Sequence, residues 1–105
     1  MSEDRATYNN DSQMRGYKVL MALAGNEFTG LLPSEIAKRV DTAPSAITRD
    51  LSVLQQAGMA EQIQETGRWR LGPKVVQIAL AFSAHLERSQ IRINENNQRY
   101  TRQPN

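Results

Sequence analysis

The sequence predicts a mainly α-helical domain that carries one small β-hairpin and ends in a long helix. Three observations favour this fold class. Apolar residues recur every three or four positions, one short stretch alternates basic and apolar residues, and prolines and glycines separate the segments. A length of 105 residues is enough for a single core. The chain has no cysteine, and its one histidine, His85, argues against a histidine-rich metal centre, so no cofactor is expected.

The first helix is predicted by apolar residues at helical spacing between positions 17 and 24. Asp11 or Ser12 is expected to cap it, and Gly25 is expected to stop it. The polar stretch before it, residues 1–11, lacks hydrophobic periodicity and is expected to be a disordered arm.

Two short helices follow, separated by a turn at residues 41–43. One is expected to begin at Pro33 and the other at Pro44. Proline suits the first helical position, because the backbone N–H that it lacks would have no partner within the helix there. Gly58 is expected to end the second of these helices. Its buried stripe is expected to comprise Ile47, Leu51 and Leu54. Two short helices joined by such a turn form a helix-turn-helix unit.

A β-hairpin is predicted next, with strands at residues 60–64 and 68–71 and a turn between them. Its second strand places Trp69 on the core side. A helix-turn-helix followed by a hairpin is a winged helix-turn-helix, and we expect this domain to occupy residues 12–72. Residues 28–32 are expected to form a connector that touches the sheet.

The last helix is predicted for residues 73–98, with a flexible tail at 99–105 and fraying near the asparagines at 94–97. Apolar residues recur along it at steps of four and three, which is a heptad-like pattern. An exposed stripe of this kind favours pairing with a second copy, so a homodimer is expected. The expected interface comprises Val75, Ala79, Phe82, Leu86 and Ile93.

Charge is unevenly distributed along the chain. Residues 66–105 hold seven basic and two acidic residues, a net charge of +5, whereas residues 1–65 have a net charge of −3. A basic half suits an anionic partner such as nucleic acid, although a solvated charged surface explains it equally well. No apolar run reaches the roughly 18 residues of a membrane span, and the N-terminus is no secretory signal. We therefore expect a cytoplasmic protein that is nucleoid-associated when bound to DNA.

Several motifs resemble the DNA-binding domain of IclR-type transcriptional regulators. They are Ser34-Glu35-Ile36-Ala37, Pro44-Ser45-Ala46-Ile47-Thr48-Arg49, Leu54 with Ala57-Gly58, and Gly67-Arg68-Trp69-Arg70-Leu71-Gly72-Pro73. The last motif is the most specific, and the resemblance covers roughly half of the chain. It implies a winged helix, a linker and dimer helix after the wing, and binding to an operator.

The sequence departs from this family in two respects. Family members usually carry a large C-terminal effector-binding domain, and the sequence ends before one could begin, so a truncated longer regulator is one alternative. Asp50 stands where the family pattern usually has an apolar residue. If half buried, it would need a partner such as Arg49 or Arg39.

The helix that begins at Pro44 is the candidate reader of the DNA major groove. Arg49 can donate two hydrogen bonds to a guanine, and Ser45 and Thr48 can hydrogen-bond to bases or phosphates. Ala46 can make an apolar contact with a thymine methyl group. The alternative is a plain solvent-exposed face. The candidate DNA-binding residues are Ser34, Lys38, Pro44, Ser45, Ala46, Thr48, Arg49, Ser52, Arg68 and Arg70.

The two wing arginines are expected to lie opposite Trp69, with Arg68 near the exposed tip. They can lie along phosphates or in the minor groove, or they can pair with Glu61 or Glu65 across the hairpin. Trp69 is expected in the core.

The predicted function is sequence-specific binding of double-stranded DNA, as a small transcriptional regulator on an inverted-repeat operator. It would act either by occluding a promoter, as a repressor does, or by contacting polymerase. Two alternatives stay open: an accessory factor in replication, partition or transposition, and a protein–protein interaction module. His85 has no partner for catalysis, so no enzyme is expected.

Overall fold

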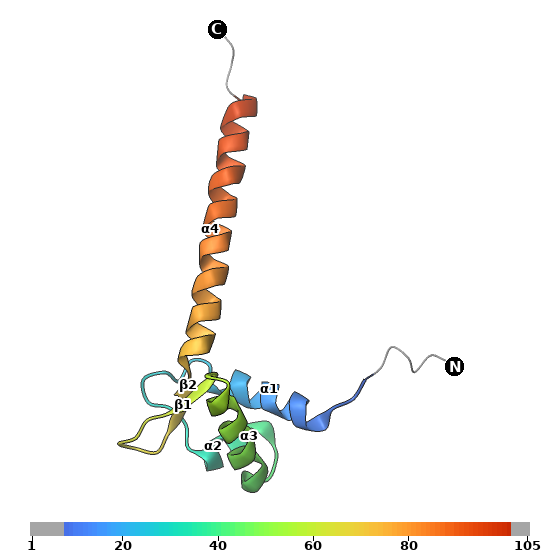
Figure 1. Cartoon of the computed structure of the whole chain (residues 1–105), viewed down its shortest axis with the longest axis vertical. Coiled ribbons are helices and arrows are strands. Elements are labelled where there is room, and N and C mark those ends of the chain that lie inside the picture. The colour runs from blue at the N-terminus through green and yellow to red at the C-terminus, as the bar shows by residue number, and fades with distance from the viewer. Residues whose placement is uncertain (1–7, 102–105) are drawn as a thin grey trace, which may run out of the picture. The chain divides into compact units, whose positions relative to one another are not determined.

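The computed structural model describes residues 8–101, with side chains to residue 99, and it has the predicted winged helix-turn-helix fold (Figure 1). Of the described residues, 8–75 form one compact unit, and the rest of the last helix forms a second. The expectations for residues 1–7 and 102–105 lie outside the described residues. The elements in chain order are α1 (Asp11–Leu23), α2 (Pro33–Val40), α3 (Pro44–Gln56), β1 (Ala60–Gln62), β2 (Trp69–Leu71) and α4 (Pro73–Thr101).

Helix α1 begins one residue earlier than predicted. Its cap is Asn10, whose Oδ1 accepts a hydrogen bond from the backbone N–H of Gln13 at 2.9 Å. Asn10 takes this place because its side chain reaches an N–H that has no partner within the helix. The expected cap at Asp11 or Ser12 is therefore wrong. The helix ends at Leu23, just before Gly25, as the sequence predicts.

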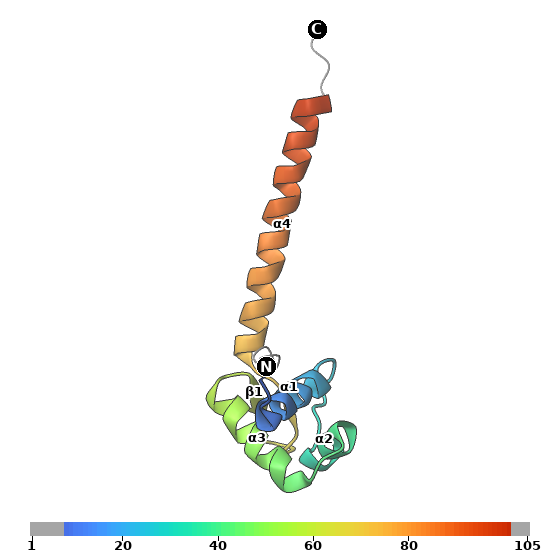
Figure 2. The ribbon, with the colours of Figure 1, turned by 90° about the vertical axis from the view of Figure 1, so that its right-hand side faces the viewer.

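Helices α2 and α3 begin at Pro33 and Pro44, which confirms the prediction from proline. The turn between them places Asp41 in the left-handed region, with φ of 60°. The backbone N–H of Thr42 donates to the carbonyl of Ala37 at 3.0 Å, which closes the end of α2. Each of the three helices of the domain packs against the other two, as Figure 2 shows.

The core lies where these helices meet the wing. Trp69 of β2 is buried in it, as predicted. Every element from α1 to β2 and the connector before α2 supplies at least one buried apolar side chain, so the wing is part of the same core. The buried residues are Val19, Leu23, Leu31, Ile36, Ala37, Ile47, Leu51, Ala60 and Trp69.

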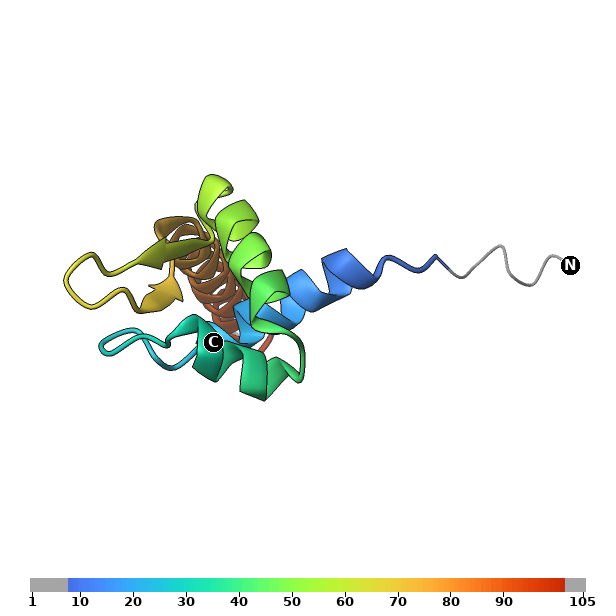
Figure 3. The same ribbon diagram turned by 90° about the horizontal axis from the view of Figure 1, so that it is seen from below.

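The wing is a two-stranded antiparallel sheet in which Ala60 lies opposite Leu71 and Gln62 lies opposite Trp69. Its strands are shorter than predicted, at three residues each. The connector adds a bridge on the other edge of β2, because the backbones of Leu31 and Trp69 exchange two hydrogen bonds of 2.8 Å. This confirms the expected contact with the sheet, and Figure 3 shows the connector and the wing side by side.

Helix α4 begins at Pro73 as predicted but continues to Thr101, past the expected end at residue 98. The expected fraying near the asparagines is absent. Extending an existing helix costs far less than starting one, and the side chain of Gln90 donates to that of Asn94 at 3.3 Å. Within this helix, Phe82, Leu86 and Ile93 are all exposed.

Candidate nucleic-acid interface

One side of α3 is polar and exposed, and its opposite side is buried. Ile47 and Leu51 point into the core and are almost fully buried. The four polar residues that the sequence assigns to the outward side are all exposed, and so is Pro44 at its start. These outward residues are Ser45, Thr48, Arg49 and Ser52. The stripe at Ile47, Leu51 and the half-buried Leu54 therefore fixes which side of α3 meets solvent.

Ala46 does not belong to this outward side, so its predicted outward orientation is wrong. Only 8% of Ala46 is exposed. It lies one helical turn before Asp50, which is also buried, on the flank of the apolar stripe. The buried face of α3 is thus wider than its three large apolar residues indicate.

Two outward side chains differ in the hydrogen-bonding capacity that they offer. The Oγ1 of Thr48 donates to the carbonyl of Pro44 at 3.2 Å, so its proton is used within the helix and its oxygen can still accept. Arg49 makes no side-chain hydrogen bond or ion pair within residues 8–101. Its planar guanidinium can therefore present its N–H donors to a ligand without breaking an existing contact.

The predicted residues of α2 lie next to the start of α3. Ser34 and Lys38 are exposed. Together with Pro44 they line a shallow hollow of about 360 Å³ between the two helices. The structure therefore brings these three predicted residues together at the helix-turn-helix.

Asp50 has a different partner from either one predicted. Its side chain is about 10% exposed and pairs with Arg15 of α1, so Arg49 and Arg39 are both wrong as its expected partner. The Nε of Arg15 donates to Oδ2 at 2.6 Å and Nη2 donates to Oδ1 at 3.0 Å. This hydrogen-bonded carboxylate raises the pKa of Arg15 above its ordinary value.

Arg68 is not at an exposed tip and pairs with neither Glu61 nor Glu65. Its side chain is 29% exposed. Its Nη1 donates to Glu35 Oε1 at 3.0 Å and to the carbonyl of Gly30 at 3.2 Å. The predicted position is wrong because the connector and the start of α2 lie beside the wing, and each offers one acceptor. Arg68 therefore ties the wing to the start of α2.

Glu35 is shared between this contact and the end of its own helix. Its Oε1 also accepts the backbone N–H of Leu32 at 2.8 Å. That N–H, and then the charge of Arg68, hold the pKa of Glu35 below its ordinary value, against an opposing effect of desolvation. Glu35 is therefore stabilised as a carboxylate.

Arg70 makes the cross-strand contact that was one of the two alternatives. Its Nε donates to Glu61 Oε2 at 2.7 Å, and both side chains are partly exposed. The two residues lie opposite each other in the sheet register. Exposed pairs of this kind hold a side chain only weakly, so Arg70 can exchange this partner for another anion.

Sequence reasoning missed Arg15 and Glu35. Arg15 lies one and two turns before Val19 and Leu23, so its place on the buried face of α1 was a usable signal. Glu35 lies three residues after the residue that precedes α2, a position from which acidic side chains reach back to the helix start.

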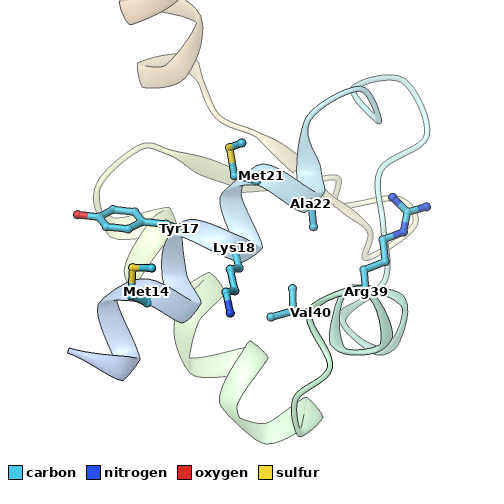
Figure 4. Close-up of a pocket in the computed structure, with 7 residues that line it drawn as sticks. All are labelled: Met14, Tyr17, Lys18, Met21, Ala22, Arg39 and Val40. Atoms are coloured by element: carbon cyan, nitrogen blue, oxygen red, sulfur yellow. The ribbon is translucent and has the colours of Figure 1, made fainter. Parts of the chain in front are cut away.

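A surface hollow of about 600 Å³ lies between α1 and α2 (Figure 4). Met14, Tyr17 and Met21 form an exposed apolar stripe on α1. Lys18 and Val40 point toward each other across the hollow. The lining offers two cations, Lys18 and Arg39, and no carboxylate. This apolar surface was not among the predicted site residues.

Two further classes of site were sought in the described part of the chain. No three histidine, cysteine, aspartate or glutamate side chains gather there in a way that could hold a metal ion. Within residues 8–101, none of the helices combines the length and the apolar character of a membrane span.

Comparison with known proteins places these features in context. No family model matches the chain. The chain is 41% identical over 54 residues to the HTH-type transcriptional regulator BhcR of Paracoccus denitrificans, which is 51% of this chain and 19% of BhcR. Pseudomonas aeruginosa HmgR matches with a TM-score of 0.62 and 29% identity, over 69% of this chain and 29% of HmgR. The chain thus spans less than a third of the length of either relative.

Further solved structures share the fold. An IclR family transcriptional regulator from Brucella abortus matches with a TM-score of 0.63 and 23% identity, over 82% of this chain and 32% of that protein. ZitR of Lactococcus lactis matches with a TM-score of 0.53 and 22% identity, over 88% of this chain and 71% of ZitR. Taken with BhcR and HmgR, these findings confirm the resemblance of this chain to an IclR-type winged helix-turn-helix domain.

Proposed function

We propose that this chain, with its IclR-type winged helix-turn-helix, binds double-stranded DNA sequence-specifically and regulates transcription from an operator. The observation that carries the proposal is the outward side of α3, where Ser45, Thr48, Arg49 and Ser52 are all exposed. The core holds the opposite side of the same helix, so these side chains are presented on a rigid element. The names of BhcR and of the Brucella abortus relative, both transcriptional regulators, support it.

Helix α3 has the side chains that a major-groove reader needs. Arg49, unpaired within the described residues, can donate two parallel hydrogen bonds to the O6 and N7 of a guanine. Ser45 and Ser52 can donate to base edges or to phosphates. Ser34 and Lys38 lie beside the start of α3 and are suited to phosphates, which position the protein without reading sequence.

The wing adds a second contact in this proposal. Arg68 uses Nη1 to hold the connector and Glu35, and its other N–H groups can meet a phosphate. Arg70 can leave Glu61 for the DNA backbone. The wing arginines thereby contribute charge, and α3 contributes the reading of bases.

We further propose that the protein acts as a homodimer through α4. Val75 and Ala79 precede Phe82, Leu86 and Ile93 on one stripe, and the last three are exposed, Phe82 by 63%. Burial of each large apolar side chain contributes about 1.5–3 kcal/mol before the loss of association entropy. Two copies related by a twofold axis would read an inverted repeat.

Sedimentation tests the dimer. At micromolar concentration the wild-type protein should sediment as a dimer, and the double variant Phe82→Asp with Leu86→Asp should sediment as a monomer. Val76→Asp with Leu80→Asp is the matched control, because it adds the same two charges to exposed positions on a different face of α4. A wild-type protein that is monomeric at all concentrations would contradict the dimer.

The test of the function is selection from a random-sequence DNA duplex library by the wild-type protein. We expect an inverted repeat to be enriched, and its affinity to fall as salt rises because phosphate contacts release counterions. A library that stays random after repeated rounds, together with salt-insensitive capture of a protein partner, would instead favour a protein–protein module. Mapping of bound sites on the genome then separates a promoter-bound regulator from an accessory factor in replication, partition or transposition. It also tests the proposed cytoplasmic, nucleoid-associated location.

A further inference from the structure

A buried ion pair joins α1 to the helix proposed to read DNA. Asp50 is charged and yet buried in the described part of the chain, and it lies directly after Arg49 in the sequence. Arg15, 35 positions earlier, meets it with two hydrogen bonds of 2.6 and 3.0 Å. Both donors come from one planar guanidinium, and both carboxylate oxygens are used.

This geometry restricts α3 more than apolar packing does. Contacts such as those of Ile47 and Leu51 are non-directional and tolerate small rotations of a helix about its axis. A fork-to-fork pair fixes both the separation and the relative orientation of the two groups. Because Asp50 is on the flank of α3, its clamp to α1 sets the rotation of α3 and hence the direction in which Arg49 leaves the helix.

The pair also has an electrostatic consequence. A carboxylate without a partner on a DNA-reading helix would repel phosphate and would be costly to bury. Arg15 supplies a compensating charge from a neighbouring helix, so none of the outward residues of α3 is needed for it. Arg49 remains available for a base, which it would not be if it were the partner of Asp50.

We propose that Arg15 and Asp50 form a positioning pair that sets the rotation of α3 and thereby the base selectivity of Arg49. This inference rests on the proposed function. It assigns neither residue a contact with DNA: both act through Arg49.

The test replaces the pair without changing net charge. The double variant Arg15→Met with Asp50→Leu removes one charge of each sign and keeps apolar bulk at the contact, so it is expected to fold even if each single variant does not. Lys18→Met is the matched control, because Lys18 is an exposed cation on the same helix with no ion pair among residues 8–101. The probes are the duplex that wild type enriches and a scrambled duplex of equal composition.

Two readouts separate positioning from a merely structural role. We expect the double variant to lose roughly tenfold in the ratio of its affinities for the two duplexes, since a bidentate base contact depends on alignment. The scrambled duplex should bind as it does to wild type, and Lys18→Met should keep the wild-type ratio. Arg49→Ala lowers this affinity ratio by some factor in wild type. In the double variant we expect that factor to be at least about threefold smaller, because the two sites are coupled.

The outcomes distinguish this inference from the proposed function. A folded double variant that keeps the wild-type ratio, with an undiminished effect of Arg49→Ala, would overturn the positioning role and leave DNA binding intact. If the double variant does not fold, Arg15→Lys provides the same comparison, since it keeps the charge and loses the fork. A wild-type protein that enriches no duplex would overturn the proposed function, and this inference with it.

Discussion

The outward side of α3 and the wing both carry arginines that the sequence predicts to contact DNA, but the structure holds them differently. Arg49 on α3 has no partner in the described part of the chain. On the wing, Arg68 is bonded to Glu35 and Gly30, and Arg70 is bonded to Glu61. Arginines of equal charge can therefore have different roles. Arg49 can direct all its donors outward, whereas Arg68 also ties the wing to the connector and α2.

The largest expected effect tests whether the wing is part of the core. Trp69→Ala should lower the free energy of unfolding by about 3–5 kcal/mol, because it leaves a cavity where the wing meets the three helices. Urea denaturation measures this loss. Phe28→Ala is the matched control, since Phe28 is another aromatic residue and is 100% exposed. Equal destabilisation by both variants would mean that the wing is held from outside the core.

The next effect concerns α3. Arg49→Ala should weaken binding to the enriched duplex by roughly 1–3 kcal/mol and relax the preference at one base pair, while a scrambled duplex is bound almost as before. Arg49→Lys should not restore the preference, because a point charge lacks the fork. Fluorescence anisotropy with both duplexes measures these changes. If affinity for both duplexes falls by the same factor, Arg49 contacts phosphate.

A smaller effect is expected from Arg68. Arg68→Ala should weaken binding to both duplexes alike and reduce the slope of log affinity against log salt by about one per contact. Glu35→Gln is the informative comparison, because it weakens the tie between wing and α2 while the arginine stays in place. Salt titrations of both variants are the measurement. A slope that falls equally in both would show that Arg68 acts through the position of the wing alone.

The smallest effect concerns Glu35 and pH. Its pKa in the folded protein lies below the ordinary value of 4.5, so its contribution to stability is fully present above that pH and is lost as pH falls through the folded pKa. Glu35→Gln should therefore make stability less dependent on pH in the acid range below about 4.5. Thermal melts of both proteins across that range measure it. Parallel curves would argue that Glu35 is not tied to Leu32 and Arg68 in solution.

The contrast between α3 and the wing also explains how much of the structure could be predicted from the sequence. Helix starts at Pro33, Pro44 and Pro73 were predictable because proline acts locally. The outward side of α3 was predictable because the apolar stripe at Ile47 and Leu51 has a helical period. The fold and most of the candidate reading surface follow from these local signals.

The contacts that restrict side chains were not predictable in the same way. The partners Arg15–Asp50 and Glu35–Arg68 are 35 and 33 positions apart, so no local pattern pairs them. The sequence predicts a basic partner for Asp50, but it cannot identify Arg15, because no local pattern shows how α1 packs on α3. Ala46 was not predicted to be buried because it lies outside the apolar stripe at Ile47 and Leu51.

The ratio of affinities for the enriched and the scrambled duplex, measured with wild-type protein at physiological salt, tests the central claim most directly. A protein that reads bases through α3 should bind the enriched duplex at least about 10³-fold more tightly, as specific DNA-binding proteins do. Equal affinity for both duplexes, falling in parallel as salt rises, would contradict the account. It would mean that the basic residues attract the DNA backbone and that α3 reads no sequence.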